Sequence, residues 1–174
     1  MEDRRQKIVD AGLQVLGEFG YSAFTQPRIA ALAGLRQSLL TYYFPTRADL
    51  LEAVARAAAE AQLAALDTAL ASGAKLSAVL AGLVTRHDNT RVLMALAQAA
   101  DQEPALRTIF RDLTTGIVER ASQRLPATAA EATGDFIHAL GVGLAVIELA
   151  TGRPDGAART QAVLRAAFRQ LGRT

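Results

Sequence analysis

The sequence predicts an all-α protein of about nine helices, with a small N-terminal domain followed by a larger helical bundle. First, the composition is 51% hydrophobic and only 5% aromatic, and its many Ala and Leu residues favour helix over strand. Second, apolar residues recur at helical spacing, and Gly or Pro separates the runs. Third, 174 residues can form two short domains at most.

The N-terminal domain is expected to contain three short helices. An apolar run at helical spacing predicts a first helix that ends at Gly20. Thr25 is placed to cap a second helix over about residues 26–33. Gly34 interrupts the pattern before a third apolar segment at residues 35–44. Two helices joined by a short turn with Gly are typical of a helix-turn-helix.

The bundle is expected to begin with a long helix that links the two domains. Thr46 and Asp49 form a T-x-x-D capping pair at its start. Two shorter helices are predicted around residues 76–83 and 93–100. The clearest amphipathic stripe of the chain follows at residues 106–125.

The last two helices are unusually apolar. Thr128 and Glu131 form a second capping pair before a helix that is apolar nearly all round over residues 136–150, and a turn at residues 152–156 leads to the final helix. These helices predict a homodimer interface, and the alternative is that the preceding helices cover them. The expected interface residues are Phe136, Leu140, Leu144, Ile147, Val163, Leu164, Ala167, Phe168 and Leu171.

Several classes of chemistry find no support in the composition. The chain has no Cys, so disulfides, thiolate metal sites and thiol nucleophiles are excluded. It has two His and no His-x-x-x-His pair, Gly-x-Ser-x-Gly motif or glycine-rich phosphate loop. We therefore expect neither an enzyme nor a bound cofactor or metal, although a close His-carboxylate pair in a pocket would reopen the question.

The chain carries no sign of secretion or of a membrane span. Its N-terminus is charged and lacks the apolar core of a signal peptide. The most apolar stretch, residues 136–150, is shorter than the roughly 20 residues that a bilayer requires, and it contains His138 and Glu148. We expect a cytoplasmic protein.

The charge distribution is more informative than the net charge of +2. No acidic residue lies between Glu18 and Asp49, whereas Arg28, Arg36 and Arg47 do. One local surface should therefore be basic without counter-charges, which suits a nucleic acid. Three arginines in such a stretch could also be ordinary for this chain, and the charge pattern alone favours neither interpretation.

Two segments resemble the tetracycline-repressor (TetR) family of bacterial transcriptional regulators. Residues 20–35 read GYSAFTQPRIAALAGL, and residues 40–51 read LTYYFPTRADLL. The resemblance is specific over about residues 4–54, and beyond them only helix number and length agree. It implies a homodimer with a DNA-binding domain at residues 1–46 and an effector-binding and dimerisation domain at residues 47–174.

The resemblance implies which residues contact double-stranded DNA. Ile8, Phe19, Ile29, Ala33, Leu35, Leu40 and Phe44 should form the small core of the DNA-binding domain. The positions matching phosphate contacts of the family are Thr25, Tyr42, Tyr43, Thr46 and Arg47. Base reading is expected from Arg36, Gln37, Ser38 and Leu39, with Arg28 alongside.

The third helix departs from the family pattern at three positions. Arg36 replaces a small hydroxyl residue, Ser38 replaces Gly, and Thr41 replaces Tyr. Arg36 cannot cap the helix with its side chain, but arginine is the residue best suited to bind O6 and N7 of guanine. We therefore hypothesise a G-containing half-site read by Arg36 and Arg28, with a plain phosphate contact at Arg36 as an equal alternative.

The effector site is the feature that the sequence predicts least clearly. In the family, the fourth to seventh helices enclose a cavity, and such pockets are mostly apolar with a few polar groups. Residues that interrupt or border the apolar stripes are candidates to line it, and ordinary core or surface positions are the alternative for each. These candidates are Met94, Gln98, Phe110, Thr114 and His138.

The resulting hypothesis is a repressor that a small-molecule effector releases from a palindromic operator. The alternative is a helical dimer of the same fold that binds a protein or lipid-like ligand without specific DNA binding. The altered start of the third helix is the feature that keeps this alternative open.

Overall fold

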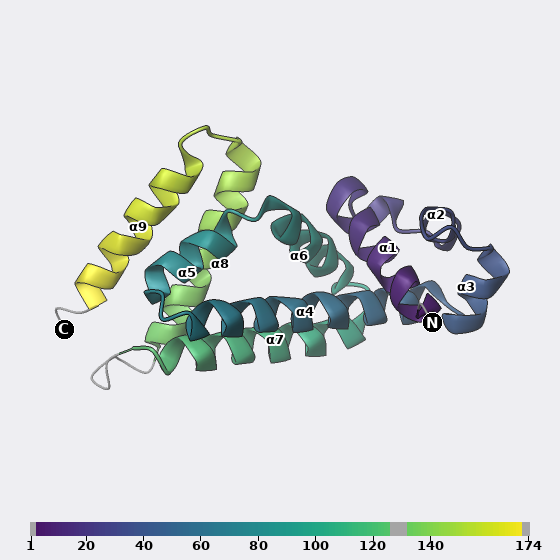
Figure 1. Cartoon of the computed structure of the whole chain (residues 1–174), viewed down its shortest axis with the longest axis horizontal. Coiled ribbons are helices and arrows are strands. Elements are labelled where there is room, and N and C mark those ends of the chain that lie inside the picture. The colour runs from purple at the N-terminus through teal and green to yellow at the C-terminus, as the bar shows by residue number, and fades with distance from the viewer. Residues whose placement is uncertain (1–2, 126–131, 172–174) are drawn as a thin grey trace. The chain divides into compact units, whose positions relative to one another are not determined.

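The computed structural model describes residues 3–125 and 132–171, and these residues form nine α-helices, one short 3₁₀ helix and no strand (Figure 1). The all-α prediction is therefore confirmed. In chain order the elements are α1 (Arg4–Phe19), η1 (Tyr21–Ala23), α2 (Gln26–Leu32), α3 (Gln37–Tyr43), α4 (Arg47–Ala71), α5 (Leu76–Val84), α6 (His87–Ala99), α7 (Pro104–Ser122), α8 (Thr133–Thr151) and α9 (Gly156–Leu171).

The helices form two compact units. One contains Met1–Ala61 and Arg91–Arg111, and the other contains Gln62–Thr90 and Asp112–Thr174. Helices α4, α6 and α7 each contribute residues to both units.

The first unit has its core among α1, α2, α3 and the first half of α4, with further buried residues from α6 and the start of α7. The prediction that Phe19 belongs to this core is wrong, because 53% of Phe19 is exposed. Helix α1 ends at Phe19, and η1 then redirects the chain so that Phe24 is fully buried instead. Leu35 is only half-buried. The largest fully buried side chains of the first unit are Ile8, Leu16, Phe24, Ile29, Leu40, Leu50, Leu51, Leu96 and Leu106.

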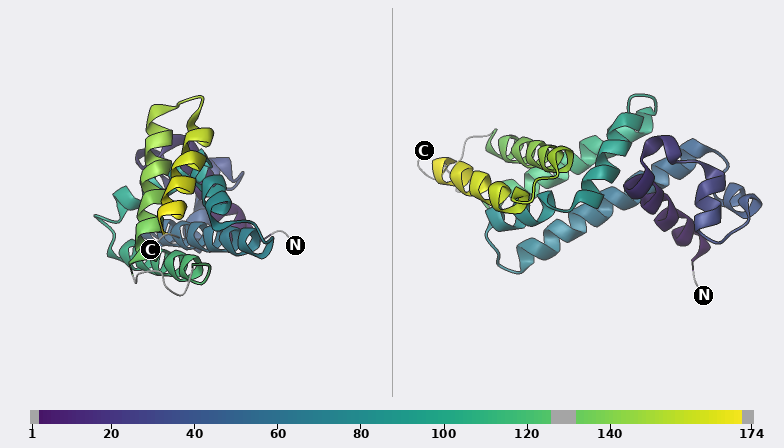
Figure 2. Two further views of the ribbon diagram at one scale, coloured as in Figure 1. Left: turned by 90° about the vertical axis from the view of Figure 1, so that its left-hand side faces the viewer. Right: turned by 90° about the horizontal axis from the view of Figure 1, so that it is seen from above.

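In the second unit α5 packs against both α8 and α9, and the end of α4 lies beside α7 (Figure 2). Leu144 of α8 and Leu164 of α9 are buried within this single chain. Their assignment to a dimer interface is therefore corrected, because the chain's own helices cover them. The apolar residues of each helix did not show which of them face the chain's own core and which would face a partner.

The predicted helix caps have different outcomes. At the start of α4 the Thr46 amide donates to Asp49 Oδ2 (2.9 Å), and the Asp49 amide donates to Thr46 Oγ1 (3.0 Å), so this capping pair is confirmed. Thr25 occupies the cap position of α2, but its side chain makes no capping hydrogen bond. The pair predicted at Thr128 and Glu131 lies outside the described residues.

Candidate nucleic-acid interface

The turn between α2 and α3 is held by main-chain hydrogen bonds. Gly34 has φ +66°, a left-handed conformation that favours glycine. Its amide donates to the Ala31 carbonyl (3.1 Å), and the Leu35 amide donates to the Ala30 carbonyl (2.9 Å). This is the Schellman arrangement, which ends a helix and fixes the direction of the chain leaving it. The turn therefore determines where α3 begins.

Polar side chains near the start of α3 are exposed. Arg36 is the N-cap residue in extended conformation, and its side chain makes no capping bond. Its guanidinium is therefore not used to close the helix, as the sequence predicts. Gln37 and Ser38 are exposed, whereas Leu39, also proposed to read bases, is half-buried and contributes partly to packing.

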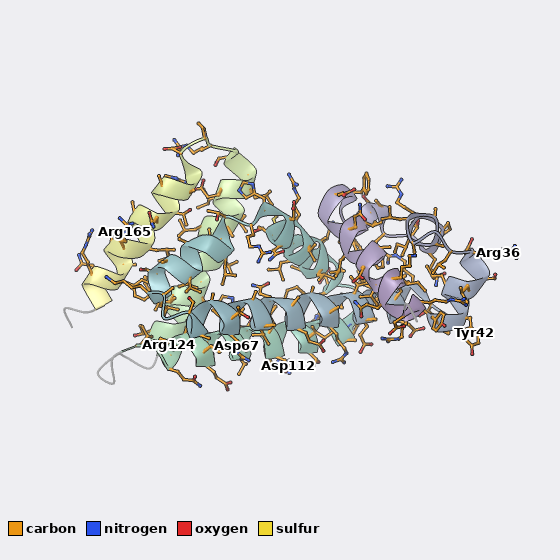
Figure 3. The ribbon with its side chains drawn as sticks, in the orientation of Figure 1. Arg36, Tyr42, Asp67, Asp112, Arg124 and Arg165 are labelled. Carbon is orange, nitrogen blue, oxygen red and sulfur yellow. The ribbon has the colours of Figure 1, made fainter. Side chains whose placement is uncertain are left out.

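The end of α3 carries two tyrosines in an edge-to-face contact. Tyr42 is 79% exposed, and its ring centroid lies 5.4 Å from that of half-buried Tyr43. Arg36 and Tyr42, both labelled in Figure 3, lie at opposite ends of this short helix. The Thr41 hydroxyl donates to the Gln37 carbonyl (3.0 Å) and so stays on its own helix.

The guanidinium of Arg47 makes hydrogen bonds and a cation-π contact within the first unit. Its Nε donates to the Phe24 carbonyl (2.9 Å), Nη1 donates to the Tyr21 hydroxyl (2.9 Å), and the guanidinium lies 4.5 Å from the centroid of the Tyr21 ring. Arg47 therefore joins α4 to η1, and its contact with phosphate stays a prediction.

Gln26 is a residue that sequence reasoning missed. Its Nε2 donates to the Phe44 carbonyl (2.9 Å), which joins the start of α2 to the end of α3. Arg28 lies over the exposed Phe19 ring at 5.1 Å from its centroid. The cation-π contact orients Arg28 on the surface of α2, the first helix of the helix-turn-helix.

Comparison with known proteins explains this arrangement. The family model for bacterial regulatory proteins of the tetR family matches residues 8–54, from α1 into α4. The HTH-type transcriptional regulator BetI of Escherichia coli K12 is 27% identical, over 93% of this chain and 90% of BetI. The chain therefore resembles regulators of the TetR family, most specifically over its helix-turn-helix. This is a family of transcriptional regulators with a DNA-binding helix-turn-helix, not of enzymes.

Solved structures similar to this chain cover nearly its whole length. A TetR-family member from Streptomyces coelicolor A3 is 28% identical with a TM-score of 0.75, covering 95% of this chain and 98% of its own. The multidrug binding protein EbrR, complexed with imidazole, is also 28% identical, with a TM-score of 0.71 and 96% of each chain covered.

An exposed apolar face runs along α8. Phe136 is 51% exposed, Val142 50% and Ile147 46%, and Val142 is not among the interface residues expected from the sequence. Leu140 of α8 and Val163, Ala167 and Phe168 of α9 are half-buried, and the side chain of Leu171 is not described.

By length and composition alone, α8 could also cross a membrane, but a buried helix of a soluble protein passes the same test.

Helix α8 also takes part in a buried ion pair. Arg159 of α9 donates through Nη2 to Oε1 of Glu148 on α8. Glu148 is only 2% exposed, and the Arg159 side chain is 31% exposed. The other carboxylate oxygen lies against Gly156, where any side chain would collide with it. The pair joins α8 to the start of α9.

The five candidate effector residues are divided between the two units. Met94, Gln98 and Phe110 belong to the first unit, and Thr114 and His138 belong to the second. Met94, Gln98 and Thr114 are exposed, whereas Phe110 and His138 are half-buried. Burial lowers the pKa of His138, and the negative charge of Asp135 opposes this shift. The imidazole is therefore mostly neutral at pH 7.

Replacing Arg47 with lysine tests whether the residue is structural. Lysine keeps the charge but cannot reach the Phe24 carbonyl and the Tyr21 hydroxyl with a planar fork. We expect the free energy of unfolding to fall by about 1–3 kcal/mol, as for a lost hydrogen bond to a charged group. Denaturant unfolding measures this, and a variant as stable as the wild type but weaker in DNA binding would favour the phosphate role.

Proposed function

We propose that this protein is a cytoplasmic repressor that binds a palindromic operator as a homodimer and is released by a small-molecule effector. Residues 1–46 bind DNA, and residues 47–174 hold the effector and the dimer interface. The observation that supports this best is the exposed surface of Arg36, Gln37, Ser38 and Tyr42 on a firmly held helix-turn-helix.

DNA contacts divide into positioning and reading. Tyr42 and Tyr43 at the end of α3 suit the phosphate backbone, which sets register without reading sequence. The Thr46 hydroxyl accepts the Asp49 amide and still has a proton to donate. Arg36 and Arg28 are exposed and suit guanine in the major groove.

A dimer explains how two such surfaces reach one operator. Two copies of α3 about 34–36 Å apart would enter successive major grooves on one face of the DNA, which requires an inverted repeat. The exposed apolar face of α8 supplies the surface for this dimer. An effector that binds only a state with another spacing would weaken DNA binding by linkage.

The effector class is supported only by a relative. EbrR is described as a multidrug binding protein and was solved with imidazole, proflavin and ethidium. We infer a small organic effector for this protein as well. A thermal-shift screen of such compounds, followed by loss of operator binding, tests this inference.

Binding to the DNA upstream of the protein's own gene separates repression from the alternative of a fold without specific DNA binding. A repressor keeps its preference for one palindromic site as rising salt weakens non-specific binding. The alternative, which the Arg36 departure keeps open, predicts equal affinity for all sequences and a uniform loss with salt.

The Arg36→Ala variant tests the base-reading role. We expect a loss of about 1–3 kcal/mol that is confined to one base position of each half-site. Binding to a set of operators with single substitutions measures it. An equal loss on every sequence would instead show that Arg36 contacts only phosphate.

A further inference from the structure

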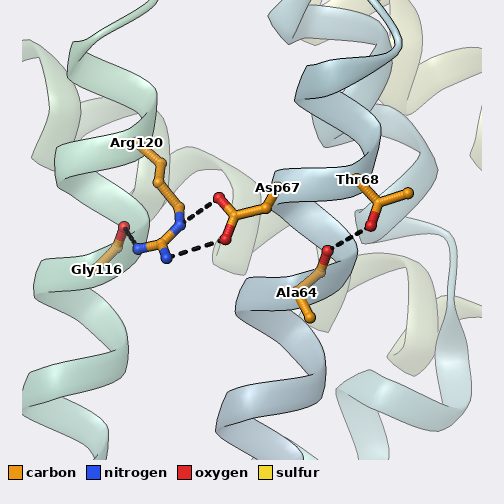
Figure 4. Close-up of polar contacts among 5 residues, drawn as sticks. All are labelled: Ala64, Asp67, Thr68, Gly116 and Arg120. Atoms are coloured by element: carbon orange, nitrogen blue, oxygen red, sulfur yellow. Dashed lines mark hydrogen bonds and ion pairs between the residues drawn. The ribbon is translucent and has the colours of Figure 1, made fainter.

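Within the second unit, Arg120 of α7 donates two parallel hydrogen bonds to the carboxylate of Asp67 on α4 (Figure 4). Nε donates to Oδ1 (2.6 Å), and Nη2 donates to Oδ2 (3.0 Å). Nη1 donates to the Gly116 carbonyl of its own helix (3.0 Å). The guanidinium is therefore anchored to α7 while it holds α4, which fixes the orientation of the fork before Asp67 binds it.

The two helices pack closely beside this pair. A Cβ atom at Gly116 would lie 3.2 Å from Leu63 Cδ2 and 3.2 Å from Arg120 Nη1. Both distances are tighter than ordinary van der Waals contact. Glycine at this position therefore lets α7 approach Leu63 of α4 at the level where Arg120 reaches Asp67.

The exposure of the pair argues against stability as its main role. The Asp67 side chain is 52% exposed and that of Arg120 29%, and pairs so open to solvent add little stability. The hydrogen bond from Arg120 lowers the pKa of Asp67, and the same bond raises the pKa of Arg120. Both groups stay charged at neutral pH. What the bidentate geometry does supply is a fixed register between α4 and α7.

Register at this point matters because α4 is one continuous helix. It runs from Arg47, just after the helix-turn-helix, to Ala71, one turn beyond Asp67. We propose that the Asp67–Arg120 pair is a latch that holds the end of α4 in the DNA-binding orientation and so sets operator affinity. This inference rests on the proposed function. Without the latch α4 samples other orientations, and apparent affinity falls with the fraction that remains competent.

A double-mutant cycle on operator binding tests the latch. The variants are Asp67→Asn, Arg120→Gln and both together, with Arg120→Lys to keep the charge but remove the fork. We expect each of the four to weaken binding about three- to thirtyfold, since both protomers of a dimer lose a latch. The double variant should be no worse than either single one, and the thermal midpoint should move little.

Glu52→Gln is the matched control. It removes the same charge from the same helix, but Glu52 pairs with Arg56 of α4 itself and joins no second helix. Its operator affinity should equal that of the wild type. Wild-type affinity in Asp67→Asn, or a loss as large in Glu52→Gln, overturns the latch alone. A wild-type chain with no sequence preference overturns the proposed function and, with it, this inference.

Discussion

Glutamate at both Phe136 and Ile147 should convert the protein into a monomer and abolish operator binding at nanomolar concentrations. Both side chains are about half exposed in the single chain, so the substitutions leave the core of the second unit intact. In a two-fold symmetric interface each substitution counts twice, and each buried unpaired carboxylate costs several kcal/mol. Sedimentation equilibrium measures the loss of the dimer.

Met94→Glu is the matched control for this experiment. Met94 is also an exposed apolar residue, at 46%, but it lies on α6 in the other unit. The control should remain dimeric. A dimer that survives the double substitution on α8 would mean that the chain associates through another surface.

Replacing Arg159 with methionine should have the largest effect on stability. The substitution leaves the carboxylate of Glu148 without its partner at 2% exposure. Breaking a buried pair from one side costs about 3–5 kcal/mol, because the remaining charge stays desolvated. Guanidinium-induced unfolding gives the free energy directly.

The double variant Glu148→Met with Arg159→Met separates this cause from a loss of packing. Replacing both ions with apolar side chains of similar volume is often neutral or stabilising. Most of the lost stability should therefore return. If Arg159→Met alone stayed within about 1 kcal/mol of the wild type, or if the double variant were worse, the carboxylate would not be the buried charge that the structure shows.

The features that could be predicted from the sequence are local. Residues of the Thr46–Asp49 capping pair are three positions apart, and Gly34 is favoured by the φ angle of its own residue. Both features could therefore be predicted from the local sequence. The exposure of Phe19 could not be predicted, because the helical spacing of apolar residues continues to Phe19 at the end of α1. The following 3₁₀ helix η1 turns the chain so that Phe24 is buried instead.

Contacts between residues far apart in the sequence could not be predicted from it. Arg47 finds the Phe24 carbonyl and the Tyr21 hydroxyl 23 and 26 residues away, and nothing in its own segment indicates either acceptor. Asp67 and Arg120 are 53 residues apart on the surfaces of two helices, each of which carries other charges. A single sequence shows which residues share a helix face but not which face meets which.

Selection of the full-length protein's preferred sites from random double-stranded DNA tests the central claim most directly. The exposed start of α3 and the proposed dimer together predict an enriched inverted repeat, with centres of the half-sites about 10 base pairs or a multiple apart. The Arg36→Ala protein should enrich the same repeat with one base position relaxed. Enrichment of no motif by the wild-type protein, with affinity that depends on salt alone, would contradict the account.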